Sequence, residues 1–321
     1  MRYSFLKIHS ASDLSRRRLP VMEAHSGAPG PVVWLTACAH GDEVGGLVVI
    51  QEIFKRLRKH PLQRGSLHAF PMMNPLGFEV GTRQIAASEE DLNRSFPGSP
   101  TGTLAERIAD RIFSTIMTSR PAAVIDLHND WIHSIPYAVV DPLPPEAPAE
   151  VASLALRLAS SSGFLIIRDD DHLRRTLPFA LMTRGVPSIT IELGEAYVVN
   201  EKNVDFGVQS VWSMLGHLGV IDPPQPPFVW DGPAHAMGRV LPYTARPYAS
   251  MSGVLRFLVR PGAVVKPGQP VARVYNAFGK LQETINAPSE AVVLGHADSS
   301  VAFPGAPVMA FGRMDDGQAT A

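Results

Sequence analysis

Short apolar runs that alternate with segments of helical periodicity constrain this chain more than any other feature. Residues 31–39, PVVWLTACA, are apolar and β-branched, as is typical of a strand buried on both faces of a sheet. Residues 43–59, EVGGLVVIQEIFKRLRK, follow with apolar residues at helical spacing. The two segments therefore predict a strand, a loop and a helix in succession.

The same alternation continues to about residue 219. Further strands are predicted at residues 65–75, 121–130, 134–141, 164–169 and 187–195, and further helices at residues 103–117, 147–163 and 202–219. This order predicts an α/β fold, with a sheet that is covered by helices on both faces. Ligand sites in such folds gather at the carboxyl ends of the strands.

The composition changes after residue 221. Residues 222–233, DPPQPPFVWDGP, contain five prolines in twelve residues, which favours a stiff connector and disfavours a helix. Beyond it, short apolar strands alternate with Pro-Gly turns. We therefore expect two domains, an α/β domain at residues 1–225 and an all-β domain at residues 226–321.

Composition and charge narrow the class of partner. The chain has 321 residues, of which 45% are hydrophobic, and a formal net charge of -1. This balance gives no basic footprint for nucleic acid or an anionic membrane, so a small molecule is the expected partner. A single cysteine excludes an internal disulfide and fits a reducing compartment. With neither an apolar signal segment nor a run long enough to span a bilayer, we expect a soluble, cytoplasmic protein.

Two potential metal ligands follow the first predicted strand. His40 and Glu43 form an H-x-x-E pair across the turn between strand and helix. Imidazole and carboxylate groups are suitable ligands of Zn²⁺, and a catalytic zinc takes three protein ligands with one position left for water. The alternative is that His40 is an ordinary loop residue and that Glu43 stabilises the first turn of the helix.

A third potential ligand lies at the end of another predicted buried strand. His128 follows the apolar segment AAVIDL and begins a polar stretch, HND. An isolated histidine at this position would be interpreted as a residue on the surface. Together with His40 and Glu43, however, it completes a set of two histidines and one glutamate, which is a known catalytic zinc set.

The segment EEDLNRSFPGSP, residues 89–100, provides groups that suit an anionic substrate. Arg94 offers a planar fork for a carboxylate, and Asn93 offers a neutral amide beside it. Asp91 is able to hold the far nitrogen of a metal-bound histidine. The alternative is a solvated turn, because charged residues next to Pro-Gly are typical of turns.

A carboxylate also follows the strand PSITIELGE. Glu192 is suited to act as general base beside a metal-bound water, whereas Glu195, after Gly194, is more typical of a loop. Arg184 precedes Glu192 by eight residues and is able to bind a second acidic group of a substrate. An exposed arginine without a function is the alternative for Arg184.

Four motifs in order, AHGDE, DLNRSFPG, DLH and IELG, resemble the succinylglutamate desuccinylase and aspartoacylase family, a branch of the zinc carboxypeptidase superfamily. The resemblance covers most of residues 30–220 and implies a zinc-carboxypeptidase-like mixed sheet flanked by helices. The C-terminal β region is similar to the small barrel-like domain of these enzymes, which is itself similar to biotinyl and lipoyl modules.

The resemblance implies a role for each matching residue. It implies that His40, Glu43 and His128 bind one Zn²⁺ per chain and that Asp91 holds a zinc-bound histidine.

For the substrate, it implies that Asn93 and Arg94 bind the carboxylate of an N-acyl amino acid and that Glu192 is the general base. An arginine upstream of the D-L-N-R motif polarises the scissile carbonyl in this family, and Arg83 is the candidate here. The separation of Arg83 from Arg94 is longer than in the aspartoacylase branch.

The function that these residues favour is zinc-dependent hydrolysis of the amide bond of a small N-acyl amino acid or a related compound. A carboxypeptidase-like peptidase and a non-catalytic carboxylate-binding protein of the same fold are the alternatives. A nucleotide-binding protein is disfavoured, because the sequence has neither G-x-G-x-x-G nor a G-x-x-x-x-G-K-[ST] loop. We expect the β domain to act as a lid, a spacer or a contact in a homo-oligomer.

Overall fold

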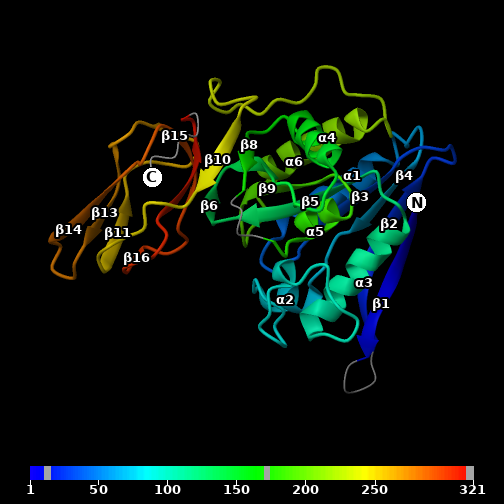
Figure 1. Ribbon diagram of the computed structural model, residues 1–321, viewed down its shortest axis with the longest axis horizontal. Helices are drawn as coiled ribbons and strands as arrows, with labels where there is room; N and C mark the ends of the chain where they lie inside the picture. The colour runs from blue at the N-terminus through cyan, green and yellow to red at the C-terminus, as the bar shows by residue number, and fades with distance from the viewer. Residues whose placement is uncertain (11–15, 170–173, 316–321) are drawn as a thin grey trace.

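The computed structural model describes residues 1–10, 16–169 and 174–315, and Figure 1 shows their arrangement. The helices are α1 (Gly45–Arg56), α2 (Pro75–Val80), the short 3-10 helix η1 (Leu92–Arg94), α3 (Leu104–Thr118), α4 (Ala149–Ser161), α5 (Leu177–Thr183) and α6 (Glu201–His217). The first nine strands are β1 (Arg2–Ser10), β2 (Arg16–His25), β3 (Val32–Ala37), β4 (Ser66–Phe70), β5 (Ala123–Asp130), β6 (His133–Ser134), β7 (Pro136–Val140), β8 (Ile166–Arg168) and β9 (Ser188–Glu195). The remaining strands are β10 (Val240–Thr244), β11 (Gly253–Phe257), β12 (Val264–Val265), β13 (Pro270–Tyr275), β14 (Leu281–Asn286), β15 (Ala291–His296), β16 (Val301–Ala302) and β17 (Met309–Arg313).

One large mixed sheet runs through the molecule. Its order is β1-β2-β4-β3-β5-β9-β7-β8-β10-β17-β15-β12, with β6 paired to β15. The centre, β4-β3-β5-β9, is parallel, and β7 pairs antiparallel to β9. The parallel pairing places the carboxyl ends of β3, β5 and β9 at one edge, where ligand sites form in such sheets.

Helices cover both faces of the sheet, as the alternation of strands and helices predicts. Side chains of α1, α4 and α6 pack against one face in one buried apolar cluster, and side chains of α3 and α5 pack against the other face in a second cluster. Figure 1 shows α4 and α6 above the sheet and α3 below it. The expected mixed α/β fold is therefore confirmed.

Local sequence signals account for individual helices. A capping box begins α3, because the Thr103 side chain accepts from the backbone N–H of Glu106 while the Glu106 carboxylate accepts from the backbone N–H of Thr103. The expected amphipathic helix at residues 103–117 is thus present almost to the residue.

The C-terminal strands form two groups. Strands β10, β17, β15 and β12 extend the large sheet, and β14-β13-β11-β16 form a separate four-stranded sheet. A buried cluster of residues 249–311 packs between strands of the two groups. The expected all-β composition is present, whereas the barrel-like architecture and the division at residue 225 stay predictions. Within the described residues, no helix is both long and apolar enough to cross a membrane.

Candidate active site

The candidate site lies where three neighbouring strands end. His40 follows β3 after a short turn, while His128 and Glu192 lie near the ends of β5 and β9. His128 and Glu192 are register partners across the β5–β9 pair. The sheet therefore brings side chains from distant parts of the sequence to one edge.

Two glycines at the start of α1 allow the helix to approach β5 closely. A Cβ on Gly45 would lie 2.8 Å from Oδ1 of Asn129, and a Cβ on Gly46 would lie 2.8 Å from Cβ of Leu127. The backbone N–H of Gly45 also donates to Oδ1 of Asn129, at 2.9 Å. This close contact allows Glu43, two residues before Gly45, to reach His128.

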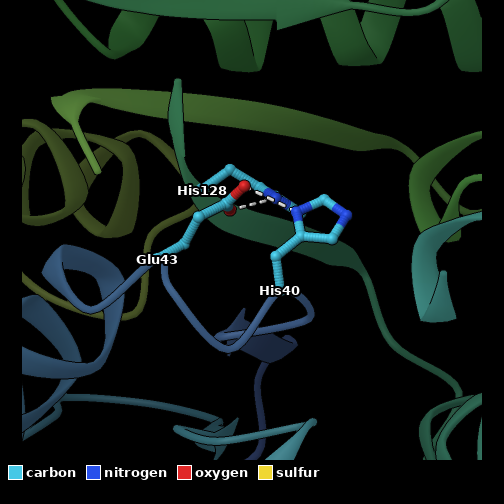
Figure 2. A group of neighbouring side chains, drawn as sticks. All are labelled: His40, Glu43 and His128. Atoms are coloured by element: carbon cyan, nitrogen blue, oxygen red, sulfur yellow. Dashed lines mark hydrogen bonds and ion pairs between the residues drawn. The ribbon is translucent and has the colours of Figure 1, made fainter. Parts of the chain in front are cut away.

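His40, Glu43 and His128 converge on one point (Figure 2). Nδ1 of His40 lies 2.6 Å from Oε1 of Glu43, and Nδ1 of His128 lies 2.7 Å from Oε2 of the same carboxylate. One ligand atom of each residue lies within 4.8 Å of the others, and all three residues are buried. The structure thus brings together the three ligands expected from the sequence.

A carboxylate lies beside the outer nitrogen of each histidine. Nε2 of His40 is 3.1 Å from Oδ1 of Asp91, and Nε2 of His128 is 2.9 Å from Oδ2 of Asp126. Asp126 had not been expected at the site. Because carboxylates commonly orient metal-binding histidines in this way, both contacts leave Nδ1 as the nitrogen available for a metal.

The buried carboxylates and histidines of the cluster shift one another's pKa values. Burial alone would raise the pKa of the Glu43 carboxyl, but the charges of His40 and His128 outweigh this effect and lower the pKa. Burial alone would lower the pKa of His128, but Asp126 and Glu43 raise it above its ordinary value. The cluster therefore keeps the Glu43 carboxylate ionised, and an ionised carboxylate is a suitable ligand for a cation.

Glu192 differs from these residues because it lacks a partner. Its Oε2 atom is buried and has no hydrogen-bond partner within the described parts of the chain. Burial raises the pKa of the Glu192 carboxyl well above its usual range, an effect that His128 opposes and Asp130 increases. A carboxyl group with a raised pKa is a better proton acceptor than an ordinary glutamate, as a general base requires.

The opposite side of the site is a loop. Nε and Nη2 of Arg83 donate to Oδ2 of Asp91 at 3.2 and 3.1 Å, and Nη1 of Arg83 lies 3.7 Å from Oε1 of Glu43. Oδ1 of Asn93 accepts from the backbone N–H of Leu177 at 3.0 Å, and Nη1 of Arg94 donates to the carbonyl of Asn93 at 2.9 Å. These bonds hold Arg83, Asn93 and Arg94 beside the three potential ligands.

A cavity of about 220 Å³ opens above the cluster. It is lined by all the expected site residues except Asp91 and Arg184, and by further residues that include Asp130, Tyr137, Asp141, Asp169, Thr176 and Tyr243. Tyr243 comes from β10, so the C-terminal part of the chain contributes to the wall. None of these additional residues was predicted from the sequence. Asp130 is the last residue of the polar HND stretch, which is the signal that could have identified it.

Two of the additional acids are unusually weak. Burial raises the pKa of Asp130 to about 6, and the hydroxyl of Tyr137 donates to its Oδ2 at 2.7 Å. Burial and the neighbouring charge of Asp169 raise the pKa of Asp141 to about 7. The cavity therefore combines the cationic groups of Arg83 and Arg94 with a set of acids.

Arg184 lies elsewhere. It is exposed at the C-terminal end of α5 and lines a surface depression with Pro97, Gly98, Asp110, Phe113, Ser114 and Met117. The structure does not bring Arg184 to the cavity.

The sequence is similar to those of known proteins. Residues 29–218 match the family model described as the succinylglutamate desuccinylase/aspartoacylase catalytic domain. An N-alpha-acetyl-L-2,4-diaminobutyric acid deacetylase from Halomonas elongata is 28% identical over 288 residues, which is 86% of this chain and 80% of the relative.

Solved structures agree on the fold. The product-bound ectoine utilization protein EutE (DoeB) from Ruegeria pomeroyi has a TM-score of 0.82 at 21% identity, covering 97% of this chain and 95% of that one. A metallo-carboxypeptidase from Burkholderia cenocepacia has a TM-score of 0.54 at 17% identity, covering 67% of this chain and 64% of that one. Because the family model spans more than half of the sequence, the chain belongs to the succinylglutamate desuccinylase/aspartoacylase family.

Proposed function

We propose that this protein is a zinc-dependent deacylase that hydrolyses the amide bond of a small N-acyl amino acid or a related compound. The observation that carries the proposal is the convergence of His40, Glu43 and His128 at the base of a cavity lined by Glu192 and Arg94. Membership of a deacylase family supports it.

The donor set fits Zn²⁺. Two imidazole nitrogens and one carboxylate form a catalytic zinc set that leaves a coordination position open. In this proposal, His40 and His128 bind through Nδ1, because Asp91 and Asp126 engage their Nε2 atoms. When bound, Zn²⁺ would lower the pKa of a water molecule and polarise a carbonyl group.

Glu192 is the proposed general base. A carboxylate beside the potential ligands is positioned to take a proton from the attacking water and to deliver it to the departing amine. Burial raises the pKa of the Glu192 carboxyl, which makes its carboxylate a stronger base than an exposed glutamate. Its buried oxygen without a partner is the atom that we expect to exchange the proton.

Arg83 is the proposed residue that stabilises negative charge on the scissile carbonyl oxygen. Two of its nitrogens are engaged with Asp91, which fixes the guanidinium at the cavity wall. Nη1 is the remaining terminal nitrogen and is aimed toward the Glu43 side of the site. A charged donor held in place before the reaction stabilises a developing oxyanion strongly.

Asn93 and Arg94 are the proposed binding site for the substrate carboxylate. Oδ1 of Asn93 is occupied by the backbone N–H of Leu177, so Nδ2 provides the donors for a ligand. Arg94 retains guanidinium donors besides the one that bonds to the carbonyl of Asn93. Together they offer a cationic fork and a neutral amide.

Among N-acyl amino acids, we propose a substrate that also has an amino group on its side chain. The relative from Halomonas elongata is named for an acetylated diaminobutyric acid. Asp130, Asp141 and Asp169 give the cavity acidic groups that would bind an ammonium ion and repel a second carboxylate. The small cavity also favours a single amino acid over a peptide.

The test is a panel of N-acyl amino acids incubated with the zinc-loaded protein, with release of free amine as the measurement. We expect N-acetyl-diaminobutyrate to be turned over faster than N-acetylaspartate and N-succinylglutamate. Hydrolysis of none of the panel would contradict the deacylase proposal, whereas a preference for N-acetylaspartate would contradict only the proposed side-chain preference.

A further inference from the structure

Asp126 and Thr36 form a buried pair behind His128. Asp126 alternates with His128 along β5, so the two side chains lie on the same face of the strand. Thr36 is the register partner of Asp126 on the neighbouring strand β3. Both Thr36 and Asp126 are 0% exposed.

Each oxygen of the Asp126 carboxylate has one partner. The hydroxyl of Thr36 donates to Oδ1 at 2.6 Å, and Nε2 of His128 lies 2.9 Å from Oδ2. A fully buried carboxylate is costly unless its oxygens are hydrogen-bonded. Asp126 therefore requires a hydrogen on Nε2 of His128, and this requirement keeps Nδ1 directed at Glu43.

The support of His40 is built differently. Asp91, which contacts Nε2 of His40, belongs to a loop, and its side chain is 21% exposed. Its Oδ2 accepts from Arg83, whose side chain is itself 41% exposed, and its Oδ1 accepts from the backbone N–H of Asn93 in the same segment. Asp126 is instead fixed by a hydroxyl on the adjacent strand, where backbone pairing restricts both residues.

We infer that Asp126 is a positioning residue for His128, and that Thr36 sets the affinity for Zn²⁺ from a distance by locking the Asp126 side chain. This inference rests on the proposed zinc-dependent function. Thr36 lies two side chains away from the metal position, and outer partners of metal-binding histidines typically change metal affinity about 10- to 100-fold.

The experiment measures the zinc affinity of the full-length protein by competition with a chromophoric chelator. Thr36→Val keeps the shape of the side chain and removes the hydroxyl, and we expect affinity about 10-fold weaker. Asp126→Asn keeps the shape and removes the charge, and we expect a loss of about 10- to 100-fold. Thr36→Ser retains the hydroxyl and is expected to remain within about 2-fold of the wild-type protein, by the same reasoning.

Ser188→Ala is the matched control for the loss of a buried hydroxyl. Ser188 is 0% exposed, and its hydroxyl donates to the carbonyl of Val186, away from the potential ligands. We expect this variant to bind zinc with wild-type affinity. The visible spectrum of the Co²⁺-loaded protein provides a second measurement, and we expect it to change in Thr36→Val but not in Ser188→Ala.

The outcomes separate the inference from the proposed function. If the wild-type protein binds zinc and Thr36→Val and Asp126→Asn bind it equally well, the inference is wrong while the deacylase proposal stands. If Asp126→Asn fails to fold, Thr36→Val and its serine control decide the matter. A wild-type protein that binds no zinc would overturn both the zinc proposal and the inference.

Discussion

The two sides of the cavity are built in different ways. His128 and Glu192 lie on paired strands of the central sheet, and backbone pairing fixes their separation. Asn93 and Arg94 lie in the short 3-10 helix η1, and the Asn93 side chain accepts from the backbone N–H of Leu177 at the N-terminal end of α5. We therefore expect Glu192 on the strand side to act in the chemical step, and Asn93 and Arg94 on the other side to bind the substrate carboxylate. Substitution of Glu192 should lower kcat, and substitution of Asn93 or Arg94 should raise KM.

The largest effect is expected for Glu192→Gln on the strand side. Glutamine keeps the size of the side chain but cannot accept the proton, so we expect kcat to fall by about 10²- to 10⁴-fold. Zinc content, measured by atomic absorption, should stay at the wild-type level because Glu192 is not a proposed ligand.

Glu195→Gln is the matched control on the same strand. Oε2 of Glu195 accepts from the side-chain amide of Asn200 at 2.6 Å, so it has a structural partner that Glu192 lacks. Equal losses of kcat in the Glu192 and Glu195 variants would disprove a specific role of Glu192 as base.

Arg94→Ala tests the other side of the cavity. Loss of a charged hydrogen bond to a carboxylate costs about 1.5–3 kcal/mol, which corresponds to an increase in KM of about 10- to 150-fold. We expect kcat to change far less, because Arg94 is not proposed to contact the reacting carbonyl. Steady-state kinetics with the preferred panel substrate give both constants.

Arg94→Lys sharpens this test. Lysine keeps the charge without the planar fork, so an intermediate KM is expected. A fall in kcat with unchanged KM in either variant would break the proposed division between the two sides.

The sequence predicted the site residues at the ends of the central strands, but not those inside a strand or on a distant strand. An apolar run that ends in a polar residue is visible in one short segment, and this pattern identified His40, His128 and Glu192. Asp126 was missed because it lies inside such a run, where its role depends on Thr36 in the adjacent strand. Tyr243 was missed because β10 reaches the cavity through its pairing with β8, far away in the sequence.

The edge of the fold was also missed. Strands β1 and β2 form an antiparallel pair at the end of the large sheet. An edge strand has one unpaired side and buries few side chains, so its sequence pattern is weak. Tyr3 and Phe5, for example, are 57% and 67% exposed. The β1 segment therefore lacks the buried run that identified the central strands, and β2, which pairs with both β1 and β4, has only Leu19, Val21 and Ala24 buried.

A smaller effect, on stability rather than turnover, is expected for Asp141→Asn, directly after β7. The pKa of Asp141 is raised to about 7 in the folded protein, above its ordinary value of 3.8. The folded state therefore holds this proton more tightly than the unfolded state. Its contribution to stability is fully present below about pH 4 and is lost as the pH rises through about 7.

Asparagine at position 141 cannot ionise, so the variant should be less sensitive to pH. With chelator present, thermal unfolding should show that the Tm of the variant relative to that of the wild type is higher at pH 8 than at pH 5. The raised pKa of Asp130 also makes stability fall as the pH rises, but it does so in both proteins. The difference in Tm between variant and wild type therefore excludes the contribution of Asp130. A difference in Tm that stays constant from pH 5 to pH 8 would contradict the buried ionisation of Asp141.

The smallest effect is expected for Arg184→Ala. Arg184 is close to Glu192 in sequence, but it precedes β9, whereas Glu192 lies toward the carboxyl end of that strand. Ser188 and Glu192 are separated by four residues of strand, or roughly 13 Å. Arg184 is therefore at the wrong end of the strand for a site that forms at the carboxyl end. We expect kcat/KM within about twofold of wild type, as for surface substitutions in general. A change in KM as large as that of Arg94→Ala would show that the substrate extends well beyond the cavity.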